Sequence, residues 1–180
     1  MNQHVALITG GAKGIGRGIA LDLASRQWKI AVCYRTSDAE AKTTAQEIMQ
    51  RGGQALVIRC DVSDPVAAKN MVTQVEKEWG RIDVLINGAG PYHRINLFDE
   101  TIEGWNDMFD GNLHPIFYLA QAVAPGMKAR KSGHIISFSM ANADQMEAQP
   151  DVTAHYIAKA GVLILTRTLA KLLAPYGITV

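Results

Sequence analysis

Residues 5–20, VALITGGAKGIGRGIA, decide the fold of this chain. Four apolar residues run into a glycine turn, and apolar residues at helical spacing follow it, so the stretch predicts a strand, a phosphate-binding loop and a helix. Gly10, Gly14 and Gly16 allow the backbone to turn sharply, to approach a pyrophosphate closely and to bring the helix onto the sheet. Free amide groups at the start of the helix face the anion. The expected ligand is a dinucleotide.

The glycine loop has two other interpretations. Its spacing, G-x3-G-x-G, differs from the G-x-G-x-x-G fingerprint, and a glycine loop after a strand can be only a tight turn. A mononucleotide P-loop is disfavoured, because Gly14 follows Lys13 where that motif requires a serine or threonine for magnesium.

The composition indicates one domain that acts on a small molecule. The 180 residues are 48% hydrophobic, which is enough for a substantial single core. The 18 basic and 17 acidic side chains nearly cancel and form no basic stripe, so nothing favours nucleic acid or an anionic membrane surface as a partner. A small neutral or anionic substrate fits better.

Cysteine and histidine placement disfavours secretion and metal binding. Cys33 and Cys60 lie at the ends of apolar runs and not in a spaced disulfide framework, so reduced thiols and a cytoplasmic location are expected. The sequence shows no signal peptide and no apolar run long enough to cross a bilayer. No metal site is expected, because four of the histidines share no metal-ligand spacing. They are His4, His93, His114 and His134.

Short apolar runs alternate with longer stretches of helical periodicity. The expected strands are Val5–Ile8, Lys29–Val32, Ala55–Ile58, Val84–Ile86 and His134–Phe138. The expected helices are Ile15–Arg26, Ala39–Arg51, Val66–Trp79, Ile102–Asn112, Pro115–Met127 and Thr153–Ala174. Right-handed crossovers between them give a parallel sheet covered on both faces, which binds ligands beyond the carboxyl ends of its strands. Functional residues are therefore expected just after each strand.

The residue after the second strand predicts the cofactor. About 20 residues past the glycine loop, a dinucleotide fold places an acid that accepts from the ribose 2′-OH of NAD. This chain has Arg35 there, and Arg35 with Lys13 can pair with a 2′-phosphate, which favours NADP. The alternative is that Arg35 is a solvated loop arginine.

The ends of the third and fourth strands also carry binding residues. Asp61 could accept from an adenine amino group, whereas Asp64 with Pro65 is most simply a helix cap. The small residues of Asn87–Gly90 permit close approach to a flat ligand.

Taken together, these motifs resemble the short-chain dehydrogenase/reductase family, and most of all its 3-oxoacyl-[acyl-carrier-protein] reductase branch. The motifs are Thr9-Gly10-x3-Gly14-x-Gly16, Asp61-Val62, Asn87-Gly88-Ala89-Gly90, Asn112 and His155-Tyr156-Ile157-Ala158-Lys159-Ala160-Gly161. The resemblance implies a Rossmann-type, doubly wound α/β/α fold, with Thr9 and Asp83 bracing the cofactor turns. The cofactor-binding residues that follow are Gly10, Lys13, Gly14, Ile15, Gly16, Arg35, Asp61, Val62, Asn87, Ala89, Gly90 and Lys159.

The family's Asn–Ser–Tyr–Lys active site matches this chain in part. Asn112 resembles the asparagine that holds a proton-relay water, and Lys159 resembles the lysine that binds the nicotinamide ribose and lowers the pKa of the neighbouring acid. The family's tyrosine lies four residues before the lysine, where this chain has His155; Tyr156 lies three before. At roughly 100° per residue, His155 lies about +40° and Tyr156 about −60° around the helix from Lys159. Either residue is a candidate proton donor.

The serine position differs as well. The family's catalytic serine corresponds to Met140, and Ser139 is one residue early. A one-residue offset on a strand faces the opposite side, so Ser139 substitutes only if the chain bulges or has left the sheet. The alternative is a capping or loop hydroxyl.

Residues 177–180 resemble the opening of the family's sixth strand. The expectation is one dinucleotide-binding domain over residues 1–180 that continues beyond Val180 in the complete protein and lacks its C-terminal strands here.

The motif series predicts an NADP-dependent oxidoreductase that transfers a hydride between nicotinamide and a carbonyl or secondary alcohol. A 3-oxoacyl thioester, such as one bound to an acyl carrier, or a similar ketone is the expected substrate. The competing prediction is a nucleotide-binding member impaired in catalysis by Met140 and His155. Apolar residues around the helix from Val162 onward also predict a homodimer or homotetramer.

Overall fold

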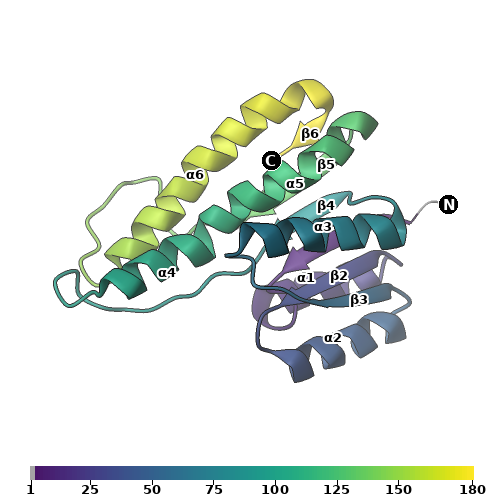
Figure 1. The fold of residues 1–180 in the computed structure, drawn as a ribbon, viewed down its shortest axis with the longest axis horizontal. Coiled ribbons are helices and arrows are strands. Elements are labelled where there is room, and N and C mark those ends of the chain that lie inside the picture. Colours follow the sequence, from purple (N-terminus) through teal and green to yellow (C-terminus); the bar gives the residue numbers. More distant parts are fainter. Residues whose placement is uncertain (1–2) are drawn as a thin grey trace.

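The computed structural model describes residues 3–180 as a parallel six-stranded sheet flanked by helices (Figure 1). In chain order, the elements are β1 (Val5–Thr9), α1 (Gly14–Ala24), β2 (Lys29–Tyr34), α2 (Asp38–Gln50), β3 (Gln54–Arg59), α3 (Pro65–Trp79), β4 (Val84–Asn87), α4 (Ile102–Asn112), α5 (His114–Arg130), β5 (Gly133–Ser137), α6 (Thr153–Leu173), the 3-10 helix η1 (Ala174–Tyr176) and β6 (Ile178–Thr179).

The strand order confirms the predicted Rossmann-type fold. The order is β3-β2-β1-β4-β5-β6, with every neighbouring pair parallel. Strand order reverses between β1 and β4, and doubly wound sheets open a ligand crevice at such a point. The glycine loop after β1 is therefore at the centre of the binding edge.

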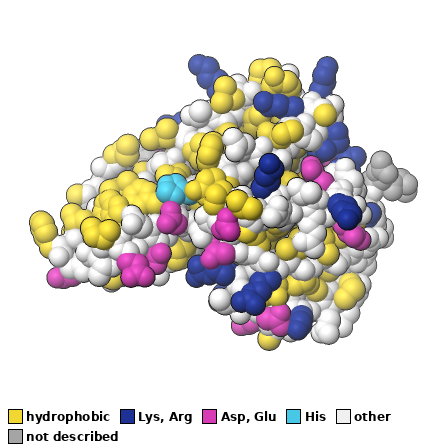
Figure 2. All heavy atoms as spheres, in the orientation of Figure 1, with side chains coloured by type: hydrophobic (Ala, Val, Ile, Leu, Met, Phe, Trp, Pro, Cys, Tyr) yellow, Lys and Arg dark blue, Asp and Glu magenta, His cyan; other side chains and the backbone are white. Residues whose placement is uncertain are grey.

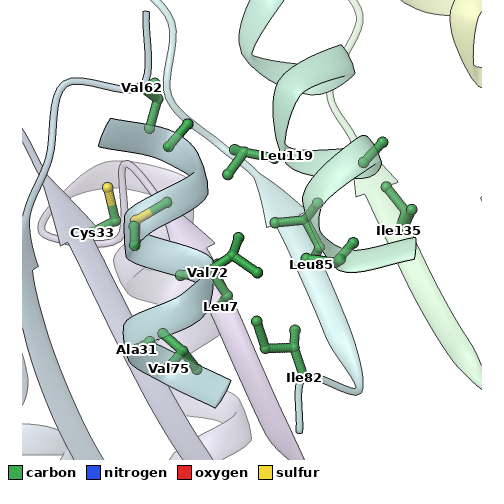
Figure 3. Packing of buried hydrophobic residues seen from close by; sticks show 14 of the residues in the cluster. Leu7, Ala31, Cys33, Val62, Val72, Val75, Ile82, Leu85, Leu119 and Ile135 are labelled. Atoms are coloured by element: carbon green, nitrogen blue, oxygen red, sulfur yellow. The ribbon is translucent and has the colours of Figure 1, made fainter. Parts of the chain in front are cut away.

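Two apolar clusters hold the helices on the sheet. Leu7 belongs to a cluster that includes buried side chains of α3 and α5 (Figure 3), and its neighbour Ile8 belongs to a cluster with α1 and α2. Successive strand residues point to opposite faces, so the apolar run Val5–Ile8 of β1 is buried on both sides. On β5 the coverage is one-sided: Ile135 is buried, while Ile136 is 46% exposed.

The element boundaries differ slightly from those predicted. β1, β2 and β4 run one or two residues longer than predicted, because Thr9, Tyr34 and Asn87 still pair in the sheet. β5 ends at Ser137, so Phe138 lies outside the strand. The last predicted helix ends at Leu173, where the 3-10 turn begins.

Only Leu113 separates α4 from α5. Pro115 has no N–H to donate to the carbonyl of Gly111, so the helical ladder is interrupted there. Asn112, the last residue of α4, lies at this break and is 2% exposed. The break places the side chain beside the loop that follows β4.

Candidate active site

The loops after β1, β2, β3 and β4 surround a groove of about 400 Å³ at the carboxyl edge of the sheet. All the residues predicted to bind cofactor line it, except Asn87 and Lys159. Sequence reasoning missed several further lining residues, which follow the same strands or lie at the α4–α5 break. They are Ala12, Cys33, Tyr34, Thr36, Ser37, Cys60, Pro91 and Gly111.

The glycine loop has the geometry of an anion cradle. Gly10 and Gly14 have positive φ angles of 65° and 58°, which only glycine adopts without strain. A Cβ on Gly16 would lie 2.5 Å from the Gly10 carbonyl oxygen, so α1 approaches the loop as closely as its backbone permits. A Cβ on Gly14 would meet nothing within 4 Å and would project into open space. That space is what a pyrophosphate at a helix N-terminus requires.

Thr9 and Asp83 lie at opposite edges of the sheet. The Thr9 hydroxyl accepts hydrogen bonds from the amides of Gly88 and Ala89, at 3.1 and 3.2 Å, and so joins the turns after β1 and β4 as predicted. The Asp83 carboxylate accepts from the Val5 amide at 2.9 Å, at the amino end of β1. The expectation that Asp83 braces a cofactor turn is wrong, because this residue precedes β4 and lies at its other end.

Arg35 and Asp61 face each other at the ends of β2 and β3. The guanidinium and the carboxylate are 3.7 Å apart, and the Arg35 side chain is 66% exposed. Burial raises the pKa of Asp61, but hydrogen bonds from Ser63 and the charge of Arg35 outweigh it and hold the pKa below its usual value. Asp61 is therefore ionised, and Arg35 is loosely held beside it.

Asn112 is oriented by backbone carbonyls. Its Nδ2 donates to the carbonyls of Pro91 and Met108, both at 3.0 Å. Its Oδ1 is buried and finds no hydrogen-bond partner among the described residues. Since Pro91 and Gly111 line the groove, this unsatisfied oxygen is available next to it for a water or a ligand donor.

Lys159 and Ser139 are linked through the loop that follows β5. The Lys159 ammonium donates to the Phe138 carbonyl at 2.9 Å, and burial lowers the pKa of this lysine. The Ser139 hydroxyl donates to the backbone carbonyl of Lys159 at 2.8 Å. The chain has left the sheet by Ser139, but its hydroxyl is occupied by the helix backbone, as the loop-hydroxyl interpretation predicts.

His155 and Tyr156 have different environments. The Tyr156 hydroxyl donates to the Asn142 carbonyl at 2.7 Å and accepts from the Glu147 amide at 3.1 Å. Both of these hydrogen bonds are therefore made to the loop before α6. Tyr156 also lines a separate, mostly apolar cavity of about 390 Å³ between that loop and α6.

His155 is 8% exposed, and its ring packs edge-on against Tyr92, with centroids 5.0 Å apart. Its Nδ1 is buried and has no partner among the described residues. Burial, and next the Lys159 ammonium, lower the pKa of His155. The Lys159 ammonium therefore acts electrostatically on His155.

Asn87 occupies a supporting position. Its Nδ2 donates to the Ser137 hydroxyl at 3.1 Å, while its Oδ1 is buried without a partner in the part of the chain described. Within residues 3–180, no group of His, Cys, Asp or Glu side chains is arranged to hold a metal ion, and no helix is both long and apolar enough to cross a bilayer.

Comparison with known proteins agrees with this geometry. The family model described as short chain dehydrogenase matches residues 4–180. The 3-oxoacyl-[acyl-carrier-protein] reductase FabG of Staphylococcus epidermidis is 38% identical over all of this chain and 72% of its own length. The corresponding reductase of Synechocystis is 34% identical over the same shares of the two chains.

Solved structures show the same fold. A short-chain type dehydrogenase/reductase from Mycobacterium marinum superimposes with a TM-score of 0.90 at 35% identity, covering 97% of this chain and 71% of that one. Acetoin dehydrogenase YohF from Salmonella typhimurium gives a TM-score of 0.90 at 28% identity, covering 98% and 69%. With the strand order, the glycine cradle and the family match in agreement, the chain belongs to the short-chain dehydrogenase family of oxidoreductases.

Proposed function

We propose that this chain is an NADP-dependent reductase of 3-oxoacyl thioesters or similar ketones. The observation that carries the proposal is the continuity of one groove, which runs from the glycine cradle past Arg35 to Pro91, where Asn112 is held. The curated relatives named as 3-oxoacyl-[acyl-carrier-protein] reductases support the substrate class.

The preference for NADP rests on charge at the end of β2. Arg35 and Lys13 both line the groove, and no acid follows β2 directly. Within residues 3–180, the ion pair of Arg35 is with the partly exposed Asp61 carboxylate at 3.7 Å, so its guanidinium can turn toward a phosphate. A phosphate accepts bidentate, charge-assisted hydrogen bonds that a ribose hydroxyl cannot match.

NADPH supplies the hydride when it is bound, and the chain's own residues hold the carbonyl oxygen and provide its proton. The Lys159 ammonium donates one of its three N–H groups to the Phe138 carbonyl, which leaves two to donate to a ribose hydroxyl or an oxygen of the substrate. His155 provides the proton in this proposal, because its ring is coupled to Lys159 while the Tyr156 hydroxyl is occupied. Because the pKa of His155 is lowered, little of the ring is protonated near neutral pH, so few molecules carry the proton to be donated.

The second candidate is a nucleotide-binding protein with little turnover. The observation that favours it is the engagement of both hydroxyls near the proposed catalytic residues, Ser139 by α6 and Tyr156 by the preceding loop. Met140, at the family's serine position, has no hydroxyl to offer.

Titration calorimetry with NADPH, followed by absorbance assays of NADPH oxidation over a panel of ketones and 3-oxoacyl thioesters, separates the two. Ketone-dependent oxidation supports the reductase. Tight binding of NADPH with no oxidation across the panel supports the second candidate and refutes the first.

The assembly we propose is a homodimer or homotetramer formed through α5 and α6. Figure 2 shows hydrophobic side chains gathered over the part of the molecule built from α4, α5 and α6. Phe117, Ile164 and Leu172 on these helices are 49%, 59% and 62% exposed. Light scattering at micromolar concentration checks this, and a monomeric mass would contradict it.

A further inference from the structure

Two thiols lie together at one end of the groove. Cys33 is opposite Ile58 in the pairing of β2 with β3, and Cys60 follows Ile58 by two residues. Because strand side chains alternate between faces, Cys33 and Cys60 point to the same face of the sheet. The Cys33 thiol lies 3.9 Å from the Cys60 carbonyl oxygen, and both side chains belong to the cluster shown in part in Figure 3.

Both cysteines also border the groove, although their side chains are mostly covered. Cys33 is 1% exposed and Cys60 is 8% exposed, and both line the groove together with Asp61, Val62 and Gly10. They are the only two cysteines of the chain. A change in either sulfur would therefore alter the wall of the groove at the end proposed to hold adenosine.

The contact between the thiols makes them unequal. The Cys33 side chain lowers the pKa of Cys60 by hydrogen bonding to its thiol. The same hydrogen bond, and next burial, raise the pKa of Cys33. Cys60 is the less covered of the two and the one whose pKa is lowered, so it is the sulfur expected to react first with an oxidant.

We propose that Cys33 and Cys60 are an oxidation site: a peroxide converts the pair to an intrachain disulfide, and this disulfide opposes binding of the dinucleotide. The Cys60 thiolate attacks hydrogen peroxide and becomes a sulfenic acid, with release of hydroxide. The Cys33 sulfur then forms the S–S bond and displaces hydroxide, which leaves as water with the thiol proton. The two thiols lose two electrons and two protons in total, and the peroxide becomes two waters.

The effect on the groove follows from the geometry. An S–S bond is about 2.05 Å long and holds the two Cα atoms within about 4.4–6.8 Å of each other, so the disulfide would fix β2 to the start of the β3–α3 loop. Asp61 and Val62 lie in that loop, directly after Cys60. A bound dinucleotide would in turn cover Cys60 and slow its oxidation. This part of the inference rests on the proposed function.

Peptide mapping of the folded protein tests the site without an activity assay. The protein is treated with hydrogen peroxide, quenched with N-ethylmaleimide and digested with trypsin. Cleavage after Lys29, Arg35, Arg59 and Lys69 separates the peptides Ile30–Arg35 and Cys60–Lys69, each with one cysteine. The expected product is a disulfide-linked pair of these peptides from monomeric chain, reversed by dithiothreitol and formed at least tenfold more slowly with saturating NADP⁺.

Brief iodoacetamide treatment of the parent chain tests the asymmetry, and peptide mapping is expected to show Cys60 labelled at least tenfold faster than Cys33. The variants Cys33→Ser and Cys60→Ser, at unchanged circular dichroism, are expected to give no linked peptides after peroxide. The site is refuted if peroxide leaves the peptides unlinked, or if Cys33 is the faster thiol.

Calorimetry with NADP⁺ on the reduced and oxidised chains separates this inference from the proposed function. Equal affinity of the two forms, or equal oxidation rates with and without bound NADP⁺, refutes the link to the cofactor. If even the reduced chain fails to bind NADP⁺, the proposed function fails and the link fails with it, whereas the linked peptides still decide the oxidation site.

Discussion

Two glycines in α1 offer a matched test of the cradle. Gly16 and Gly18 lie two residues apart in the same helix, but a Cβ on Gly16 would meet the Gly10 oxygen at 2.5 Å and the Gly10 carbonyl carbon at 2.9 Å. A Cβ on Gly18 would meet nothing within 4 Å. Gly16→Ala therefore pushes the loop backbone away from the helix, whereas Gly18→Ala adds only helix propensity.

The expected magnitudes follow from these contacts. Overpacking of this kind costs about 1–3 kcal/mol, part of which the better helix propensity of alanine offsets. Gly18→Ala should raise the free energy of unfolding by up to about 1 kcal/mol. Because the Gly10 carbonyl belongs to the anion loop, Gly16→Ala should weaken NADP⁺ binding at least tenfold, which corresponds to about 1.4 kcal/mol, and Gly18→Ala should not change it.

Urea denaturation gives the stability of both variants, and titration calorimetry gives their affinity for NADP⁺. The reasoning is refuted if the two substitutions change the affinity equally, or if Gly16→Ala binds NADP⁺ as the parent does.

Four further predictions concern single sites. Arg35→Asp should reduce the preference for NADP over NAD by about ten- to a hundredfold in binding assays, which corresponds to about 1.5–3 kcal/mol for a lost charged contact. Arg26 is an equally exposed arginine away from the groove, so the control variant Arg26→Asp should leave the preference unchanged. Since burial lowers the pKa of His155, ketone reduction should speed up as pH falls from about 8 to about 6 and imidazolium forms, and His155→Tyr should be faster than the parent at neutral pH; a parent profile that is flat over this range would contradict the assignment. Tyr156→Phe should instead lower the free energy of unfolding, measured in urea, by about 1–3 kcal/mol and preserve turnover by the folded protein. If Tyr156→Phe abolishes an otherwise robust activity, Tyr156 is the proton donor. Asp83→Asn should lower the free energy of unfolding by about 1–3 kcal/mol and leave NADP⁺ affinity unchanged, because its carboxylate serves the amino end of β1; a large loss of affinity would place it in the cofactor site.

The fold could be predicted because its causes are local. The alternation of apolar runs with helical periodicity, and the glycines that punctuate it, are visible in any window of the sequence. The boundaries were less accurate, since residues such as Tyr34 and Asn87 extend their strands through pairing with a neighbouring strand.

The interior of the site was less predictable because its contacts are distant in sequence. Whether Ser139 faces the groove depends on the Lys159 carbonyl, and the direction of Tyr156 depends on Asn142 and Glu147 in an irregular loop. Spacing along a helix placed His155 and Tyr156 on either side of Lys159, but it did not indicate which one the loop would engage. The pairing of Arg35 with Asp61 likewise needs β2 and β3 to be adjacent.

The most direct test of the proposed function is hydride transfer itself. NADPH carrying deuterium at the transferable C4 position is incubated with the protein and a 3-oxoacyl thioester, and the product is analysed by mass spectrometry. We predict a 3-hydroxyacyl product with one deuterium on the carbinol carbon, formed faster as the pH is lowered from neutral. Tight binding of NADPH to the protein with no deuterated alcohol from any ketone tested would contradict the assignment as a reductase.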